Sequence, residues 1–131
     1  MAGTTARTHI TGVHTVGVPV SDQDRALAFY RDVLGLVPTR DAPFGPGLRW
    51  LEVTPAGAAT SIALLPPQGG AAGVDTGIRL TTTDVESDHE ELRGAGVDVD
   101  DILRFGPGVP PMFTLRDPDG NVLYVVEQEQ G

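Results

Sequence analysis

The chain has 131 residues, enough for one domain with a hydrophobic core, and its 18 acidic and 9 basic residues give a net charge of −9. A charge of this sign argues against nucleic acids and anionic membranes as partners, because their phosphates require basic patches. The chain has no cysteine, which excludes disulfides, thiolate nucleophiles and cysteine-based zinc sites, and its 17 glycines and 11 prolines are typical of a loop-rich α+β or β domain.

The N-terminal residues 1–10 contain no apolar core of the kind found in signal peptides. No apolar run elsewhere approaches the length that spans a bilayer. We therefore expect a flexible N-terminal segment over residues 1–10 and a cytoplasmic protein.

Residues 11–66 predict a first module of one strand, one helix and three further strands. The helix is expected over residues 23–34, where apolar side chains recur at helical spacing. Ser21 or Asp22 is its expected N-cap, and Gly35 is expected to end it. The strand-like runs that follow cover about 36–41, 48–54 and 60–66.

A stretch of mainly small residues, 67–75, predicts a linker, and residues 76–128 then repeat the first pattern. Asp84 lies 62 residues after Asp22, and residues 83–86 form a capping box that begins a helix over 85–95. Strand-like runs follow at about 98–104, 111–116 and 121–127. We predict an α+β fold in which two βαβββ modules form curved mixed sheets around a cleft, with the helices outside, as one domain overall.

Two motifs connect this pattern with a known family. They are VPVSDQDRALAFYRDVLGL at 18–36 and FTLRDPDGNVLYVVE at 113–127. With these motifs, the chain over about 12–127 resembles the vicinal oxygen chelate superfamily, which includes glyoxalase I, extradiol dioxygenases, fosfomycin-resistance enzymes and bleomycin-resistance proteins. The resemblance implies the paired-module fold. Because this scaffold supports many unrelated activities, the function has to be argued from the site.

The resemblance also implies where a metal would be held. Metal-binding members use four side chains, one from the first and one from the last strand of each half, and these positions map to Thr15, Ala63, Gly77 and Tyr124. None of the four offers the imidazole nitrogen or carboxylate oxygen that a divalent metal requires. We therefore expect no metal and no other cofactor.

His14 lies next to the first mapped position, and a shift of one residue would make it a ligand. Such a shift turns every side chain of a strand to the opposite face, and the 62-residue offset aligns Thr15, rather than His14, with Gly77. We expect His14 to pack under the first helix or at a subunit contact.

Strand alternation indicates which side chains share the face of the mapped positions. The result is an apolar pocket with a few polar groups, which is typical of small-molecule sites. Pairing across the turn at 117–120 would place Phe113 opposite Tyr124, and Trp50, the single tryptophan, is a candidate for stacking on a ligand although its face is not assigned. The expected ligand-binding residues are Thr15, Trp50, Ala63, Gly77, Arg79, Phe113 and Tyr124.

Two of these residues have alternative interpretations. Arg79 forms either an internal ion pair with an aspartate or glutamate, or a clamp for the carboxylate, phosphate or phenolate of a ligand. Tyr124 either fills the space of the absent metal or supplies a hydrogen-bond donor and a stacking surface.

The resemblance implies a glyoxalase/bleomycin-resistance-like protein that binds a small aromatic or anionic organic molecule without a metal, as a homodimer whose interface forms the crevice. An alternative is a metal-dependent lyase, isomerase or dioxygenase of the same superfamily that uses non-standard ligands. A third is a metal-independent enzyme with Tyr124 or His14 as its acid or base. The sequence assigns no catalytic residue and does not distinguish a binding protein from an enzyme.

Overall fold

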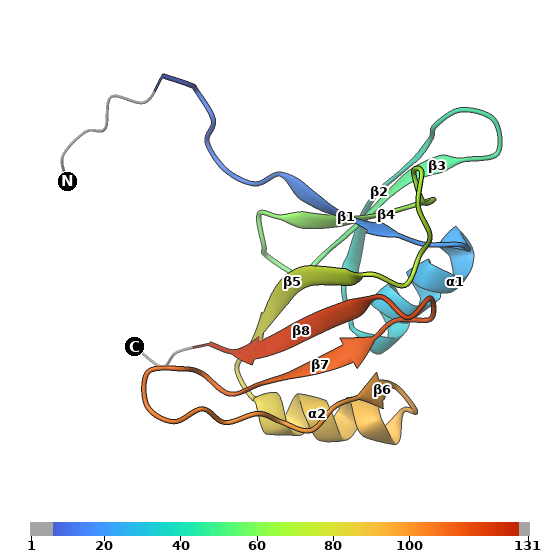
Figure 1. The fold of residues 1–131 in the computed structure, drawn as a ribbon. Coiled ribbons are helices and arrows are strands. Elements are labelled where there is room, and N and C mark those ends of the chain that lie inside the picture. The colour runs from blue at the N-terminus through green and yellow to red at the C-terminus, as the bar shows by residue number, and fades with distance from the viewer. Residues whose placement is uncertain (1–6, 129–131) are drawn as a thin grey trace.

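The computed structural model describes residues 7–128, so residues 1–6 of the expected flexible segment lie outside the described part, and residues 7–14 lead away from the body of the fold (Figure 1). The elements in chain order are β1 (Thr15–Pro19), α1 (Gln23–Ala28), a π-helical turn (Phe29–Val33), β2 (Val37–Pro43), β3 (Arg49–Thr54), β4 (Ser61–Leu65), β5 (Asp75–Thr82), α2 (Val85–Gly94), β6 (Asp98–Val99), β7 (Met112–Arg116) and β8 (Val122–Glu127). Within residues 7–128, neither α1 nor α2 has the length and apolar composition of a membrane-spanning helix.

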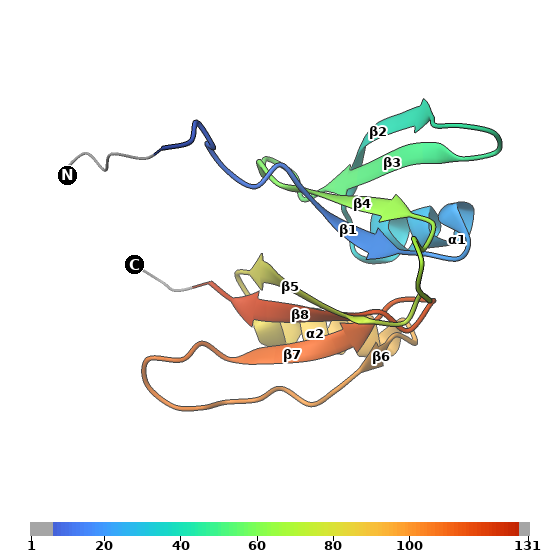
Figure 2. The same ribbon diagram turned by 45° about the horizontal axis from the view of Figure 1, so that its top comes forward.

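The strands form two four-stranded mixed sheets, which lie one above the other in Figure 2. The first sheet has the order β1-β4-β3-β2 and the second the order β5-β8-β7-β6. In each, the first strand of the module pairs in parallel with the last, and the other pairs are antiparallel. The shared order confirms the predicted α+β fold of two βαβββ modules. The boundaries given above for the modules and the linker stay predictions.

Both helices begin at the aspartates that the repeat aligns. The carboxylate of Asp22 accepts the backbone N–H of Arg25 at 3.0 Å, and that of Asp84 accepts the backbone N–H of Ser87 at 3.0 Å. Asp22 rather than Ser21 is therefore the cap of α1. The predicted first helix is α-helical only to Ala28, after which a π-helical turn completes it.

Alternation along the strands gives each sheet one face that packs against a helix and one that does not. In the first sheet Leu51, Val53, Ile62 and Leu64 belong to the buried core together with Ala26 of α1. In the second sheet the core residues are Phe113, Leu115, Leu123 and Val125, together with Val85 and Leu92 of α2. We refer to the opposite surfaces as the helix-free faces of the two sheets.

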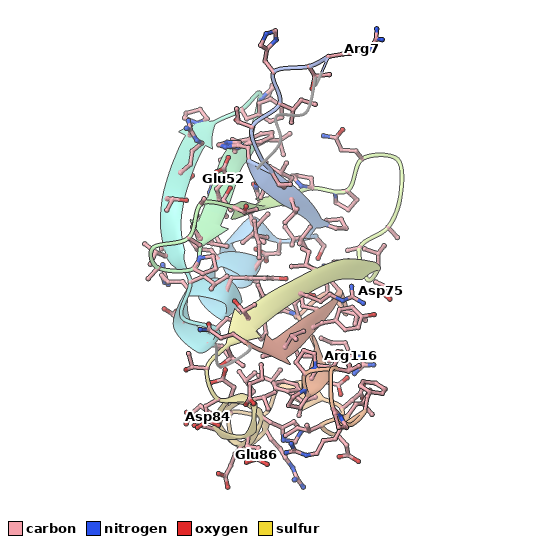
Figure 3. All side chains as sticks on the ribbon, turned by 90° about the vertical axis from the view of Figure 1, so that its left-hand side faces the viewer. Arg7, Glu52, Asp75, Asp84, Glu86 and Arg116 are labelled. Carbon is pink, nitrogen blue, oxygen red and sulfur yellow. The ribbon has the colours of Figure 1, made fainter. Side chains whose placement is uncertain are left out.

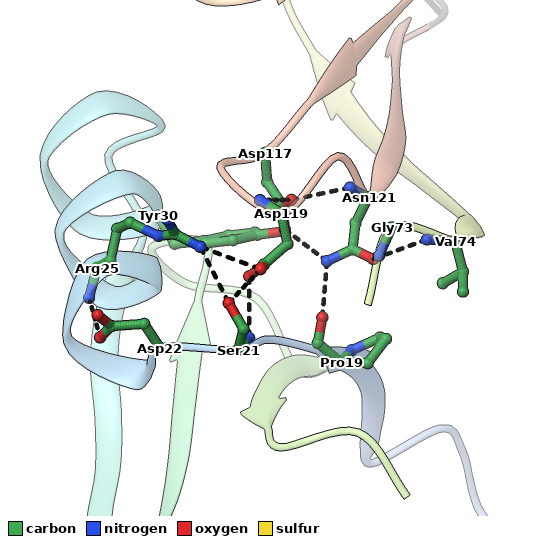
Figure 4. A network of polar contacts seen from close by, with 10 residues as sticks. All are labelled: Pro19, Ser21, Asp22, Arg25, Tyr30, Gly73, Val74, Asp117, Asp119 and Asn121. Carbon is green, nitrogen blue, oxygen red and sulfur yellow. Dashed lines mark hydrogen bonds and ion pairs between the residues drawn. The ribbon is translucent and has the colours of Figure 1, made fainter. Parts of the chain in front are cut away.

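A polar network at the β7–β8 turn joins the two modules (Figure 4). The hydroxyl of Tyr30, a residue with no exposed surface, donates to the carboxylate of Asp117 at 2.8 Å, and burial together with this carboxylate raises the pKa of Tyr30. The side chain of Asn121 donates to the carbonyl of Pro19 at 2.8 Å, and Asp119 accepts a hydrogen bond from Ser21 and pairs with Arg25. The side chains of the DPDGN motif, residues 117–121, thus form the polar contacts that hold the second module against the first.

Candidate functional site

A pocket of about 490 Å³ lies between the two modules. Residues of β1, β4 and β5 line it, including Gly17 and Ser61 on the first sheet and the run from Thr76 to Thr81 on the second. β1 and β5 are edge strands of their sheets, so the pocket separates the two edges. Gly77 and Arg79, both expected in the site, line this pocket directly.

Arg79 lies on the helix-free face of the second sheet, next to Tyr124. β5 and β8 pair these two residues directly, and the guanidinium of Arg79 lies 4.3 Å from the centroid of the Tyr124 ring. Its Nη1 donates to the carbonyl of Gly77 at 2.8 Å, and among residues 7–128 no carboxylate forms an ion pair with it. The described part of the chain therefore does not contain the internal ion pair considered above, and the exposed guanidinium contacts the face of an aromatic ring and a backbone carbonyl.

The hydroxyl of Tyr124 donates to the carboxylate of Asp75 at 2.8 Å. This hydrogen bond raises the pKa of the Tyr124 phenol, so the side chain is a neutral hydrogen-bond donor at neutral pH. Figure 3 shows Asp75 at the start of β5. Arg79, Tyr124 and Asp75 together form a small polar cluster on the second sheet.

Gly77 shapes this cluster through the backbone. Asp75 pairs with Val122 and Arg79 pairs with Tyr124, so β5 uses two more residues than β8 between these points. Gly77 has a φ of +70° within this bulge, a conformation that other residues adopt only under strain. The bulge is what places Arg79 beside Tyr124.

Three of the expected ligand-binding residues lie on the helix-free face of the first sheet: Thr15, Ala63 and Trp50. Gly17 and Glu52 are both paired with Ala63, and the hydroxyl of Thr15 donates to the carbonyl of Ser61 at 3.2 Å. Trp50 lies two residues before Glu52 on β3, so its side chain points to this same face. The structure thus assigns the face of Trp50, which the sequence left open.

Glu52 is a polar residue of this face that sequence reasoning did not place. Its side chain is buried, and its carboxylate accepts hydrogen bonds from the indole N–H of Trp50 at 2.6 Å and from the hydroxyl of Ser61 at 2.8 Å (Figure 3 shows its position). The hydrogen bond from Trp50, followed by the one from Ser61 and by the charges of His14 and Arg40, lowers the pKa of Glu52 against the opposing effect of burial. The alternation of β3, with Leu51 and Val53 between polar residues, was the available signal.

The predicted pairing of Phe113 with Tyr124 is wrong. Thr114 is the partner of Tyr124, and Phe113 pairs with Val125, so its ring points to the opposite face. There it is fully buried and packs edge-on against His89 of α2, with ring centroids 5.0 Å apart. A shift of one residue in the register is sufficient to turn the side chain over.

The prediction that His14 packs under the first helix is also wrong. His14 is exposed and precedes β1, and its carbonyl accepts the backbone N–H of Ser61 at 3.1 Å. Its alternative place at a subunit contact stays a prediction.

The four positions mapped from metal-binding relatives do not fit a divalent metal. Gly77 and Ala63 have no side-chain donor, and the hydroxyls of Thr15 and Tyr124 are engaged with a carbonyl and a carboxylate. Within residues 7–128 no group of three or more His, Asp or Glu side chains could hold a metal ion. We therefore derive no chemical step through a metal.

Two mixed sheets of identical order, each carrying one helix and meeting at a shared pocket, define a protein of the paired βαβββ class. The family model of the Glyoxalase/Bleomycin resistance protein/Dioxygenase superfamily matches residues 12–125, and the chain belongs to this superfamily.

Individual relatives agree with this assignment. The uncharacterized protein YetH of Bacillus subtilis (strain 168) is 30% identical over 123 residues, which cover 90% of this chain and 99% of YetH. A superfamily member from Sphaerobacter thermophilus DSM 20745 has a TM-score of 0.85 at 34% identity, covering 92% of this chain and 100% of its own. TnmS3, an antibiotic binding protein from Streptomyces sp. CB03234, has a TM-score of 0.79 at 34% identity, covering 94% and 100%.

Proposed function

We propose that this protein binds a small, partly aromatic or anionic organic molecule, without a metal, in the pocket between its two sheets. The observation that carries the proposal is Arg79, which lines the pocket with an exposed guanidinium and no ion-pair partner among residues 7–128. A guanidinium of this kind is suited to a carboxylate, sulfonate or phenolate. The pocket of about 490 Å³ is within the size range of small-molecule sites.

The comparisons support a binding role. TnmS3, 34% identical over nearly the whole chain, is described as an antibiotic binding protein. The donor chemistry at Thr15, Ala63, Gly77 and Tyr124 supports the metal-free part of the proposal, because none of these positions can supply an ordinary ligand. The raised pKa of Tyr124 and the exposure of His14 outside the pocket lining give the third hypothesis, a metal-independent enzyme, no specific support.

The dye anilinonaphthalene sulfonate carries both an aromatic system and an anionic group, and it serves as a probe. We expect saturable binding to the wild-type protein and a loss of affinity of about tenfold in Arg79→Met, because one charge-assisted contact is removed. The matched control is Arg93→Met, since Arg93 is exposed on α2 and does not line the pocket. Equal affinities of the two variants would remove Arg79 from the proposed role.

Native mass spectrometry of protein purified without a metal-affinity tag tests two further parts of the proposal. We propose that the chain forms a homodimer, as the resemblance to bleomycin-resistance proteins implies, and we expect the mass of two chains without bound metal. Stoichiometric zinc, nickel, manganese or iron would instead favour the alternative, a metal-dependent lyase, isomerase or dioxygenase. A single-chain mass at micromolar concentration would exclude the dimer.

A further inference from the structure

A buried carboxylate lies on a face of the first sheet that no helix covers. Glu52 is 5% exposed, and its two oxygens accept hydrogen bonds from neutral groups, the indole of Trp50 and the hydroxyl of Ser61. The nearest cation is Arg40, whose Nε lies 3.8 Å from the carboxylate and whose side chain is 59% exposed. The hydrogen bonds from Trp50 and Ser61, together with the charges of His14 and Arg40, offset the cost of burying this carboxylate.

The repeat shows that the fold itself does not require this carboxylate. Glu52 pairs with Ala63 in the first sheet, and Thr114 pairs with Tyr124 at the corresponding place in the second. Thr114 is a small neutral residue that donates to Asp100. One βαβββ module therefore forms the same strand pairing without an acidic residue at this position.

The main consequence of Glu52 is the position of Trp50. The indole N–H is the single hydrogen-bond donor of that side chain, and Glu52 accepts it at 2.6 Å. On its other side the Trp50 ring meets Phe44 edge-on, with centroids 5.6 Å apart and planes inclined by 79°. Trp50 remains partly exposed, so a carboxylate and an aromatic ring fix an indole that still has accessible surface.

We propose that Glu52 is a positioning residue for ligand recognition, and that its carboxylate holds the Trp50 indole as a wall on which a planar ring of the bound molecule stacks. This inference rests on the proposed function and assigns the aromatic part of the ligand to the first sheet. Trp50 and Glu52 do not line the pocket themselves. Ser61 links them to it, because it donates to Glu52 and also lines the pocket that Arg79 lines from the second sheet.

The position of the indole can be tested without any ligand, because Trp50 is the only tryptophan. Glu52→Leu removes both acceptors, whereas Glu52→Gln keeps an oxygen for the indole and an amide for Ser61. We expect the acrylamide quenching constant of Trp50 to rise roughly twofold in Glu52→Leu and to stay near the wild-type value in Glu52→Gln. Equal quenching in all three proteins would overturn the proposal.

A binding experiment with anilinonaphthalene sulfonate tests the effect on the ligand. It adds the variant Trp50→Phe, which keeps an aromatic ring but loses the hydrogen bond to Glu52. We expect Glu52→Leu and Trp50→Phe each to weaken dye binding about fivefold, with Glu52→Gln close to wild type. Thermal unfolding identifies any variant that fails to fold, and in that event Ser61→Ala, which removes one hydrogen bond to Glu52, replaces Glu52→Leu.

No saturable binding to the wild type would contradict the proposed function. Saturable binding that is equal in wild type, Glu52→Leu and Trp50→Phe would overturn this inference alone.

Discussion

Asp117→Asn is expected to lower the free energy of unfolding by about 2–3 kcal/mol, although aspartate and asparagine side chains have nearly the same shape. The Asp117 carboxylate accepts four hydrogen bonds, from the Tyr30 hydroxyl, the Asn121 amide and the backbone N–H groups of Asp119 and Asn121. An amide has one acceptor oxygen, so its NH₂ group would face donors. Some of the groups that donate to Asp117 would then lose their acceptor, and an unpaired buried donor lowers the free energy of unfolding.

The measurement is urea unfolding followed by circular dichroism, with Asp101→Asn as the matched control. Asp101 is exposed, so its replacement is expected to change stability by no more than about 0.5 kcal/mol. Tyr30→Phe should cost about 1–2 kcal/mol, and the double variant should cost less than the sum because both changes remove the same bond. Equal stabilities of Asp117→Asn and Asp101→Asn would contradict the role given to this carboxylate.

Asn121→Ala is expected to cost about 3 kcal/mol and to release the segment that connects the sheets. Asn121 has no exposed surface, and its side-chain oxygen accepts the backbone N–H groups of Gly73 and Val74 at 2.8 and 2.9 Å. Its amide donates to the carbonyl of Pro19 and to Asp117. Alanine removes the partners of these groups, so the connection between β4 and β5 loses the side chain that holds it.

Hydrogen exchange of the native protein, read at the amides of Gly73 and Val74, is the specific measurement. These amides should exchange much faster in Asn121→Ala, while Gln68→Ala, a change at an exposed residue of the same connection, should leave them protected. Unchanged exchange at both amides in Asn121→Ala would show that other contacts hold this segment.

Local features of the chain account for the predictions that the structure confirms. The aspartates Asp22 and Asp84 cap their helices because capping depends on a side chain and a backbone N–H three residues away. The βαβββ order follows from alternation and helical periodicity, each of which acts over a few residues. Ala63 and Tyr124 also occupy equivalent places in the two modules. Each pairs with the first strand of its module, Ala63 with Gly17 and Tyr124 with Arg79.

The pairing of Phe113 is decided in the loop between β7 and β8. The sequence indicates a turn at residues 117–120, but the Asp117 side chain accepts two backbone N–H groups of the loop, and the hairpin closes between Asp117 and Asn121. Gly120, with a φ of +84°, completes this longer loop. One added residue changes the register and moves Phe113 from the expected site into the core.

Residue types and short spacings are sufficient to predict the repeat, the helix caps and the fold class, because each of these depends on residues close together in the chain. Which residues from distant parts of the chain meet depends on how the two sheets fold and pack. The folded chain places Arg79 against Tyr124 through a bulge at Gly77, holds Trp50 by Glu52 and Ser61, and joins the modules through Tyr30, Asp117 and Asn121. These contacts depend on strand register and sheet order, which are set by the packing of the whole chain rather than by any one segment.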